Sequence, residues 1–143
     1  MKVSSRGEYA LRALLVLGKN RDTRLIPLSE IAAQTLVSTS YLEQILLQLK
    51  THGYVKSKRG THGGYGLRLP PEKVVIGEVV RQLEGPIAPM SCVSLTAYEP
   101  CPLEEGCQLQ LLWAVVRDTV AHVLDRTTLG DLLTGNLPRP PTD

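Results

Sequence analysis

The 143-residue sequence lacks phenylalanine and has a single tryptophan, so aromatic residues make up only 4% of it. Its core must therefore consist of leucine, valine, isoleucine and alanine, which favours helices packed on helices. No run of about 18 apolar residues is present, so we expect no membrane-spanning helix. Glu8 and Arg12 interrupt the apolar stretch near the N-terminus, which argues against a secretion signal. We therefore expect a cytoplasmic protein, in which a structural disulfide is disfavoured.

Motifs of common enzymes are absent as well. The sequence contains no C-x-x-C pair and no glycine-rich nucleotide loop, and its histidines, His52, His62 and His122, are spread along the chain. No pattern places a general base beside a nucleophile, which thiol-dependent catalysis requires. The sequence therefore does not favour an enzyme.

Acidic residues are missing between Gln44 and Pro71. The whole chain carries +2, but residues 1–80 hold 12 Lys and Arg against 6 Asp and Glu, whereas residues 81–143 hold 4 against 8. The stretch without acids contains Lys50, Lys56, Lys58, Arg59 and Arg68. Such a run is typical either of a solvated face or of a surface that binds a polyanion such as nucleic acid.

The first half of the sequence predicts a helix-turn-helix. Apolar residues recur at helical spacing in residues 5–19, and a second short helix is expected over residues 29–36. A polar turn, residues 37–40, leads into a third helix in which Ser40 and Glu43 fit a capping box. Two short helices joined by a tight turn are typical of this DNA-binding motif.

A basic hairpin follows the third helix. Residues 54–58 and 65–69 alternate apolar and polar side chains, and the glycine-rich residues 59–64 between them predict a turn. A hairpin directly after a helix-turn-helix is a wing. The sequence therefore predicts a mainly α fold, a winged helix-turn-helix with a two-stranded β wing, in a DNA-binding domain over residues 1–85.

The second half predicts a dimerisation element. Residues 108–126 form the longest helical pattern, with an apolar stripe along one face. Leu111 and Val115 add a second apolar side in the first half of that helix. Either both sides pack within the chain or the surplus covers a second copy, and twofold homodimers are common. We assign residues 108–136 to this long C-terminal dimerisation helix and a short terminal helix, and residues 137–143 to a disordered tail.

All three cysteines lie in one polar loop, residues 86–107, between these two units. Cys92, Cys101 and Cys107 fall within 16 residues of each other. Thiolates are soft donors that prefer iron–sulfur clusters, zinc or copper(I) to hard cations. The loop is thus a candidate for metal binding or for direct thiol oxidation.

Taken together, these segments resemble the IscR-like (Rrf2) family of bacterial winged-helix transcription factors. The resemblance rests on SSRGEYALRALLVL, on LSEIAAQTLVSTSYLEQILLQLKTHGYVKSKRGTHGGYGL, and on IGEVVRQLEG and TLGDLL, and it spans residues 1–134. It implies a homodimeric regulator, which we expect to be a repressor, that binds a pseudo-palindromic operator in double-stranded DNA and no membrane.

The resemblance also implies which residues contact DNA. The first turns of the third helix would face the major groove, and Arg59 would enter the minor groove from the wing. The expected DNA-binding set is Ser38, Thr39, Ser40, Tyr41, Glu43, Gln44, Lys50, Lys56, Lys58, Arg59, Gly60 and His62. Glu43 could instead only cap its helix, and Tyr41 could only pack.

In IscR-like proteins, the loop before the dimerisation helix binds an iron–sulfur cluster through three cysteines. The resemblance implies Cys92, Cys101 and Cys107 as ligands of a two-iron or four-iron cluster, with Glu8 of the partner subunit as a fourth ligand. The spacing C-x8-C-x5-C has a longer first gap than is usual in the family. Gln110 stands where some relatives have a histidine.

Several alternatives stay open at this point. Glu8 could be an ordinary surface carboxylate beside Arg12, and Glu104 and Glu105 are other candidate ligands. We expect the loop to sense iron–sulfur, redox or nitric oxide status through the cluster. The alternative is a cluster-free member that acts through direct thiol oxidation, zinc or a partner protein. A protein-interaction module that uses the same fold without DNA is a third reading.

Overall fold

The body of the molecule is built around the first helix, α1 (Ser5–Lys19), in a computed structural model that describes residues 2–140. Its buried residues include Ala10, Leu14 and Leu17, which share one helical face. The helix begins where the Ser4 hydroxyl accepts a hydrogen bond from the Gly7 backbone N–H at 3.2 Å. This central helix contacts the second, third, fourth and sixth helices and the wing, and the predicted bounds are confirmed.

The helix-turn-helix consists of α2 (Leu28–Thr35) and α3 (Thr39–Thr51). Leu36 ends α2 in the left-handed conformation, with φ of 59°. The chain then turns so that Ser38 caps α3, and its hydroxyl accepts a hydrogen bond from the Tyr41 backbone N–H. The predicted capping box of Ser40 and Glu43 is therefore wrong, because the helix begins before Ser40 and both residues lie exposed on its surface.

The wing pairs β1 (Val55–Lys58) with β2 (Gly64–Leu67) in an antiparallel ladder. It is fixed to the body because Ile26 and Tyr65 exchange two backbone hydrogen bonds of 2.8 Å. Gly64 makes this approach possible: its φ is +147°, and a Cβ there would lie 2.5 Å from the Ile26 carbonyl oxygen. The mainly helical winged fold that the sequence predicts is confirmed.

The C-terminal segment returns to this body. A short 3-10 helix, η1 (Pro71–Lys73), leads into α4 (Ile76–Glu84), and α6 (Leu129–Thr134) closes the core beside α1. Leu129 is fully buried, and its backbone N–H donates to the Val74 carbonyl at 2.8 Å. The last helix is thus part of the core formed by the first half of the chain.

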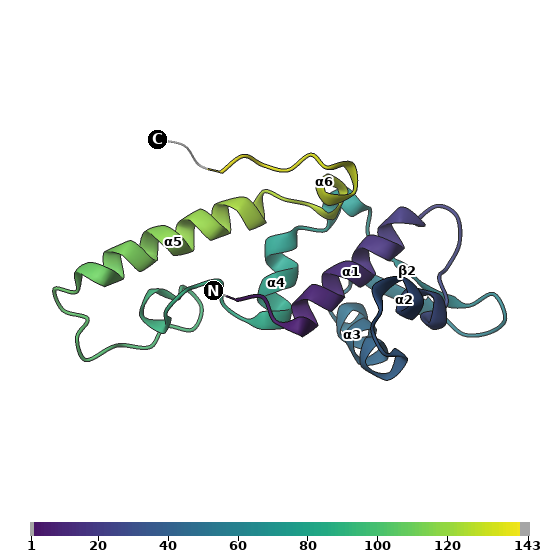
Figure 1. The fold of residues 1–143 in the computed structure, drawn as a ribbon, viewed down its shortest axis with the longest axis horizontal. Helices are drawn as coiled ribbons and strands as arrows, with labels where there is room; N and C mark the ends of the chain where they lie inside the picture. Colours follow the sequence, from purple (N-terminus) through teal and green to yellow (C-terminus); the bar gives the residue numbers. More distant parts are fainter. Residues whose placement is uncertain (1, 141–143) are drawn as a thin grey trace.

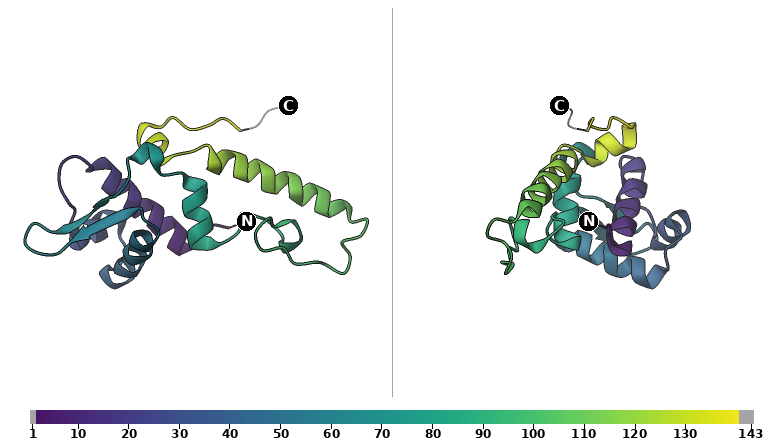
Figure 2. Two further views of the ribbon diagram at one scale, coloured as in Figure 1. Left: turned by 180° about the vertical axis from the view of Figure 1, so that it is seen from behind. Right: turned by 60° about the vertical axis from the view of Figure 1, so that its left-hand side comes forward.

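The fifth helix, α5 (Gln108–Asp125), projects from the body (Figure 1). None of its residues is buried in the single chain, and only its C-terminal end, at Val120 and Leu124, packs against the core. The cysteine loop contains η2 (Ser91–Val93) and lies along the projecting end of this helix (Figure 2). The apolar stripe of α5 therefore packs on its own domain only at one end.

Two sequence expectations concern the C-terminal tail and the absence of a membrane-spanning helix. Residues 137–140 form neither helix nor strand, and the rest of the expected tail, 141–143, lies outside the described residues. No helix between residues 2 and 140 combines the length and the apolar character needed to cross a membrane.

Candidate nucleic-acid interface and cysteine loop

A groove of about 600 Å³ runs between α3 and the wing. From α3 it is lined by Ser40, Glu43, Gln44, Leu46, Leu47 and Lys50, and from the wing by Ser57, Lys58, Arg59, Gly64 and Tyr65. Apart from Leu46, the α3 members follow one another at intervals of three or four residues, from Ser40 through Glu43 or Gln44 and Leu47 to Lys50, which places them on one side of the helix. Helix and hairpin together thus form a concave surface lined by both polar and apolar side chains.

The groove is braced and positively charged at the wing. The Lys50 ammonium donates a hydrogen bond to the Ser57 hydroxyl at 2.7 Å, which ties the end of α3 to β1. Lys58 and Arg59 are exposed beside it, and Glu43 is the only acid that lines the groove. Burial, and secondarily the Glu43 carboxylate, raise the pKa of Tyr65 further above neutrality. The surface suits a polyanion that also offers polar edges.

The structure brings together about half of the residues that the sequence nominates for DNA contact. Ser40, Glu43, Gln44, Lys50, Lys58 and Arg59 line the groove. Ser38 and Thr39 are exposed at the start of α3, and Gly60 and His62 are exposed at the wing tip. Lys56 lines a different hollow with Arg21, Arg24 and neighbouring residues, so it does not join this set.

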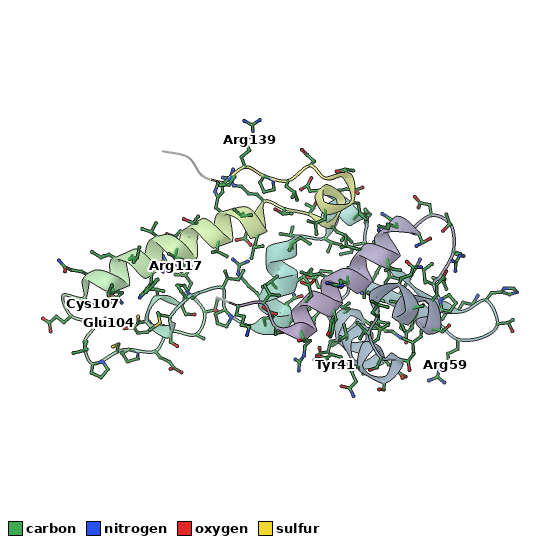
Figure 3. The ribbon with its side chains drawn as sticks, viewed as in Figure 1. Tyr41, Arg59, Glu104, Cys107, Arg117 and Arg139 are labelled. Carbon is green, nitrogen blue, oxygen red and sulfur yellow. The ribbon has the colours of Figure 1, made fainter. Side chains whose placement is uncertain are left out.

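Tyr41 lies between the interface and the core. It is half-buried, and its ring packs edge-on against Tyr9 of α1, with centroids 5.8 Å apart and an interplanar angle of 85°. Tyr41 therefore makes a packing contact, as its alternative role requires, whereas its contact with DNA stays a prediction. Tyr41 and Arg59 lie toward the same side of the molecule, opposite Arg139 (Figure 3).

Sequence reasoning missed five of the residues that line the groove. Absent from the nominated set are Leu46, Leu47, Ser57, Gly64 and Tyr65. Leu47 could have been found, because it follows Ser40 by seven residues and Glu43 by four, which is the spacing of one helical face. Tyr65 and Ser57 required knowledge of how the hairpin packs against α3.

The cysteine loop is held to α5 by polar contacts. Gln110 donates hydrogen bonds from Nε2 to the Glu104 carboxylate at 2.7 Å and to the Cys92 carbonyl at 3.1 Å. Arg117 donates to the Val93 carbonyl at 2.8 Å. Tyr98 donates its hydroxyl to Glu104, and this hydrogen bond raises the pKa of Tyr98. The loop is therefore ordered against the projecting helix.

The three thiols are free and differ in setting. Cys92 and Cys107 are half-buried, one in η2 and the other at the start of α5, whereas Cys101 is exposed. The donor chemistry suits a soft metal or an iron–sulfur cluster. Within residues 2–140, however, no three His, Cys, Asp or Glu side chains are gathered closely enough to hold a metal ion. The thiols in this arrangement do not form a closed coordination site.

The nominated fourth ligand, Glu8, is engaged in its own helix. Its carboxylate accepts a hydrogen bond from the Arg12 guanidinium at 2.9 Å, one helical turn away. Both side chains are about half exposed. Glu8 thus behaves within the single chain as a surface carboxylate, and its role toward a partner subunit stays a prediction.

Comparison with protein families matches residues 3–135 to a family described as Rrf2, iron-dependent transcriptional regulator. The chain is 40% identical over 132 residues to the HTH-type transcriptional regulator CymR of Bacillus subtilis, which covers 92% of this chain and 89% of that protein. It is 32% identical over 136 residues to the HTH-type transcriptional regulator IscR of Aliivibrio salmonicida, covering 95% and 79%.

Solved structures agree. The structure of CymR, described as the global cysteine regulator of B. subtilis, superposes with a TM-score of 0.81 at 38% identity and covers 94% of this chain and 98% of that one. The oxidised form of Staphylococcus aureus CymR gives a TM-score of 0.75 at 36% identity, with coverage of 93% and 96%. Sequence and fold therefore agree over nearly the whole length of the chain.

Proposed function

The chain belongs to the Rrf2 family of winged-helix DNA-binding transcriptional regulators, which are not enzymes, and we propose that it acts as a repressor. In this proposal it is a homodimer in the cytoplasm that binds operator DNA and thereby represses transcription. The observation that carries this proposal is the groove between α3 and the wing, with polar residues along the helix and cations along the hairpin. Such a surface matches a duplex, which combines a phosphate backbone with polar base edges.

Within this proposal α3 enters the major groove. Gln44 is suited to pair with adenine, and Glu43, which does not cap its helix, can accept from the amino group of cytosine. Arg59 at the end of β1 would enter the adjacent minor groove, whose negative potential is strongest where the groove is narrow. Ser38, Thr39, Gly60 and His62 would contact the backbone at the two ends of this surface.

The homodimer is proposed from the projecting end of α5. There the side chains of Leu109, Leu111, Leu112 and Val115 are 60%, 71%, 49% and 63% exposed. A second copy that lays its own α5 against this end would cover the same residues on both chains, as a twofold interface requires. Two recognition helices would then read half-sites about 34 Å apart, one turn of DNA.

The cysteine loop is proposed as the sensing element, because it is the part of the chain that holds all three thiols and it contacts α5 directly. Cys92, Cys101 and Cys107 would hold an iron–sulfur cluster, with Glu8 of the partner subunit as the fourth ligand. Cluster binding would require the loop to rearrange from the arrangement described above. The loop would then shift α5, and with it the spacing of the two recognition helices.

A second candidate is direct thiol oxidation without a cluster, or control through zinc or a partner protein. It is favoured by the separation of the thiols and by the similarity to CymR, whose structures are described as those of a global cysteine regulator and of an oxidised form. In this case the exposed Cys101 would be the first thiol to react, since access favours oxidation.

DNA binding is tested by selecting bound duplexes from a random pool and measuring their Kd at several salt concentrations. We expect a steep salt dependence, because several phosphate contacts per half-site release counterions. Arg59→Ala should weaken binding about tenfold. Arg139→Ala is the matched control, since Arg139 is exposed on the opposite side of the molecule and should be neutral. A flat salt dependence, or equal effects of the two substitutions, would contradict the proposed interface.

Sensing is tested on protein isolated without oxygen. Visible absorption together with iron and sulfide counts identifies a cluster, and Cys101→Ser should abolish it and change operator affinity. If the protein is colourless and iron-free, the proposal of an iron–sulfur cluster is refuted. Loss of DNA binding after mild peroxide, reversed by a thiol reductant and absent in Cys101→Ser, would then support the second candidate.

A further inference from the structure

The recognition helix exposes a leucine that its fold does not require. The other apolar residues of α3, namely Leu42, Ile45, Leu46 and Leu49, are at most 1% exposed and form its contact with the core. Leu47 is 63% exposed and belongs to no buried cluster. A single exposed leucine is common on protein surfaces. Its position decides whether it has a use.

That position is inside the groove proposed to hold DNA. Leu47 lies one turn beyond Glu43 and nearly one turn beyond Gln44, on the same face of α3, and it lines the groove with them. Lys50, the next residue along this face, reaches across to Ser57 and keeps the wing close. Among the residues that line the groove, Leu47 is the only large apolar side chain that is mostly exposed.

The major groove offers one prominent apolar group to such a side chain. Guanine, cytosine and adenine present hydrogen-bond donors and acceptors there, whereas thymine also presents its 5-methyl group. A leucine on the reading face of α3 cannot hydrogen-bond to a base edge. Removing this side chain from water is therefore favourable where it packs against that methyl group.

We propose that Leu47 packs against the 5-methyl group of a thymine and makes the protein prefer thymine at one position in each half-site. This inference rests on the proposed DNA-binding function and adds one specificity-determining residue to it. Burying one methyl group contributes about fourfold in affinity, which corresponds to about 0.8 kcal/mol. The effect is large enough to measure and small enough to leave binding itself intact.

The experiment removes the methyl group from the DNA rather than from the protein. An operator selected with the wild-type chain is resynthesised with deoxyuridine in place of each thymine of one half-site in turn, and Kd is measured by fluorescence anisotropy. Wild-type protein should lose about fourfold at one such position. Leu47→Ala should bind the thymine operator about fourfold more weakly than wild type and should not distinguish thymine from uracil there.

Leu137→Ala is the matched control. Leu137 is a leucine of similar exposure, 57%, in the segment after α6, far along the chain from the groove, and its replacement should leave the penalty for uracil unchanged. Because the methyl group is removed from the DNA, the wild-type arm does not depend on how any variant folds. Circular dichroism of Leu47→Ala should match wild type, since the residue contributes little to the core.

Two outcomes would overturn the inference while leaving the proposed function standing. One is wild-type protein that binds all uracil-substituted operators as tightly as the parent. The other is a uracil penalty that persists in Leu47→Ala, which would assign the methyl contact to another residue. If the wild-type chain retains no duplex from the random pool, the proposed function itself fails, and this inference fails with it.

Discussion

The orientation of α5 depends on one clamp between helices far apart in the sequence. Arg81 of α4 donates two hydrogen bonds, of 2.6 and 2.8 Å, to the two carboxylate oxygens of Asp125 at the end of α5. Gly77, one turn before Arg81, leaves room for this carboxylate: a Cβ at position 77 would lie 1.9 Å from the Asp125 Oδ1 atom. The glycine is therefore explained by the clamp rather than by its own backbone conformation.

This arrangement predicts that the effect of Gly77→Ala depends on Asp125. The Arg81 and Asp125 side chains are 35% and 42% exposed, so solvent screens the pair, and its bidentate geometry places its contribution near the upper end of surface pairs, about 1 kcal/mol. Gly77 is the second residue of α4, and alanine in a helix is favoured over glycine by up to about 1 kcal/mol. In the wild-type chain the two effects should nearly cancel, because the new methyl group displaces the carboxylate.

In an Asp125→Ala chain the carboxylate is gone, and the nearest remaining atom is Arg81 Nη1, which lies 3.2 Å from the Cβ position at the end of a flexible side chain. Gly77→Ala should then raise the free energy of unfolding by up to about 1 kcal/mol. The four chains of this cycle are compared by urea unfolding at one protomer concentration, since dimerisation would shift the apparent stability. A Gly77→Ala gain that is equal in both backgrounds would refute the reasoning, because it would mean that the carboxylate does not occupy the space above Gly77.

The same clamp predicts a pH dependence with a defined sign. The hydrogen bonds from Arg81 lower the pKa of Asp125 below its ordinary value of 3.8. A carboxyl whose folded-state pKa is lowered stabilises the fold above its ordinary pKa, and this contribution is lost as the pH falls through the lowered value. The stability difference between wild type and Asp125→Asn should therefore be constant near neutrality and should shrink below about pH 4.

Three further predictions follow from other contacts. Leu36→Gly should stabilise the chain by about 1 kcal/mol in urea unfolding, because Leu36 adopts a left-handed conformation and is 89% exposed; no gain would mean that the turn is not strained. Val115→Glu should convert the proposed dimer to a monomer in sedimentation, whereas a dimer that persists would place the interface elsewhere. Glu84→Ala should lower stability by about 1 kcal/mol in thermal unfolding, because Glu84 accepts hydrogen bonds from the backbone and hydroxyl of Ser4 at the start of α1; an unchanged midpoint would exclude this cap.

Local sequence patterns were sufficient to predict those elements whose structure depends on interactions between near neighbours in the chain. The bounds of α1 and the place of the wing followed from helical spacing and from a glycine-rich turn, because these patterns depend on near neighbours. The start of α3 was misplaced for an instructive reason. Ser38 and Ser40 are both residue types that commonly cap helices. The left-handed turn at Leu36 places Ser38 at the cap position, and leucine rarely adopts that conformation, so the sequence did not predict the turn.

The candidate site was predictable in its residue types and less so in its membership. Glu43, Gln44 and Arg59 could be nominated from a resemblance. Lys56 was nominated but lies outside the groove, whereas Leu47 was not nominated and lies inside it. Adjacent residues of a strand point to opposite faces, and in β1 Ser57 faces α3, whereas Lys56 lines the hollow on the other side. Only the position of the wing relative to α3 determines which of them share a groove.

By itself the sequence determined the element order, the basic hairpin, the shared loop of the three cysteines and the membership of a regulator family, since each of these is written in short runs of residues. The tertiary structure alone decided the pairs that join distant parts of the chain. Arg81 meets Asp125 across 44 positions, and Ser4 meets Glu84 across 80. No periodicity carries information over such separations, because these contacts exist only after the helices have packed.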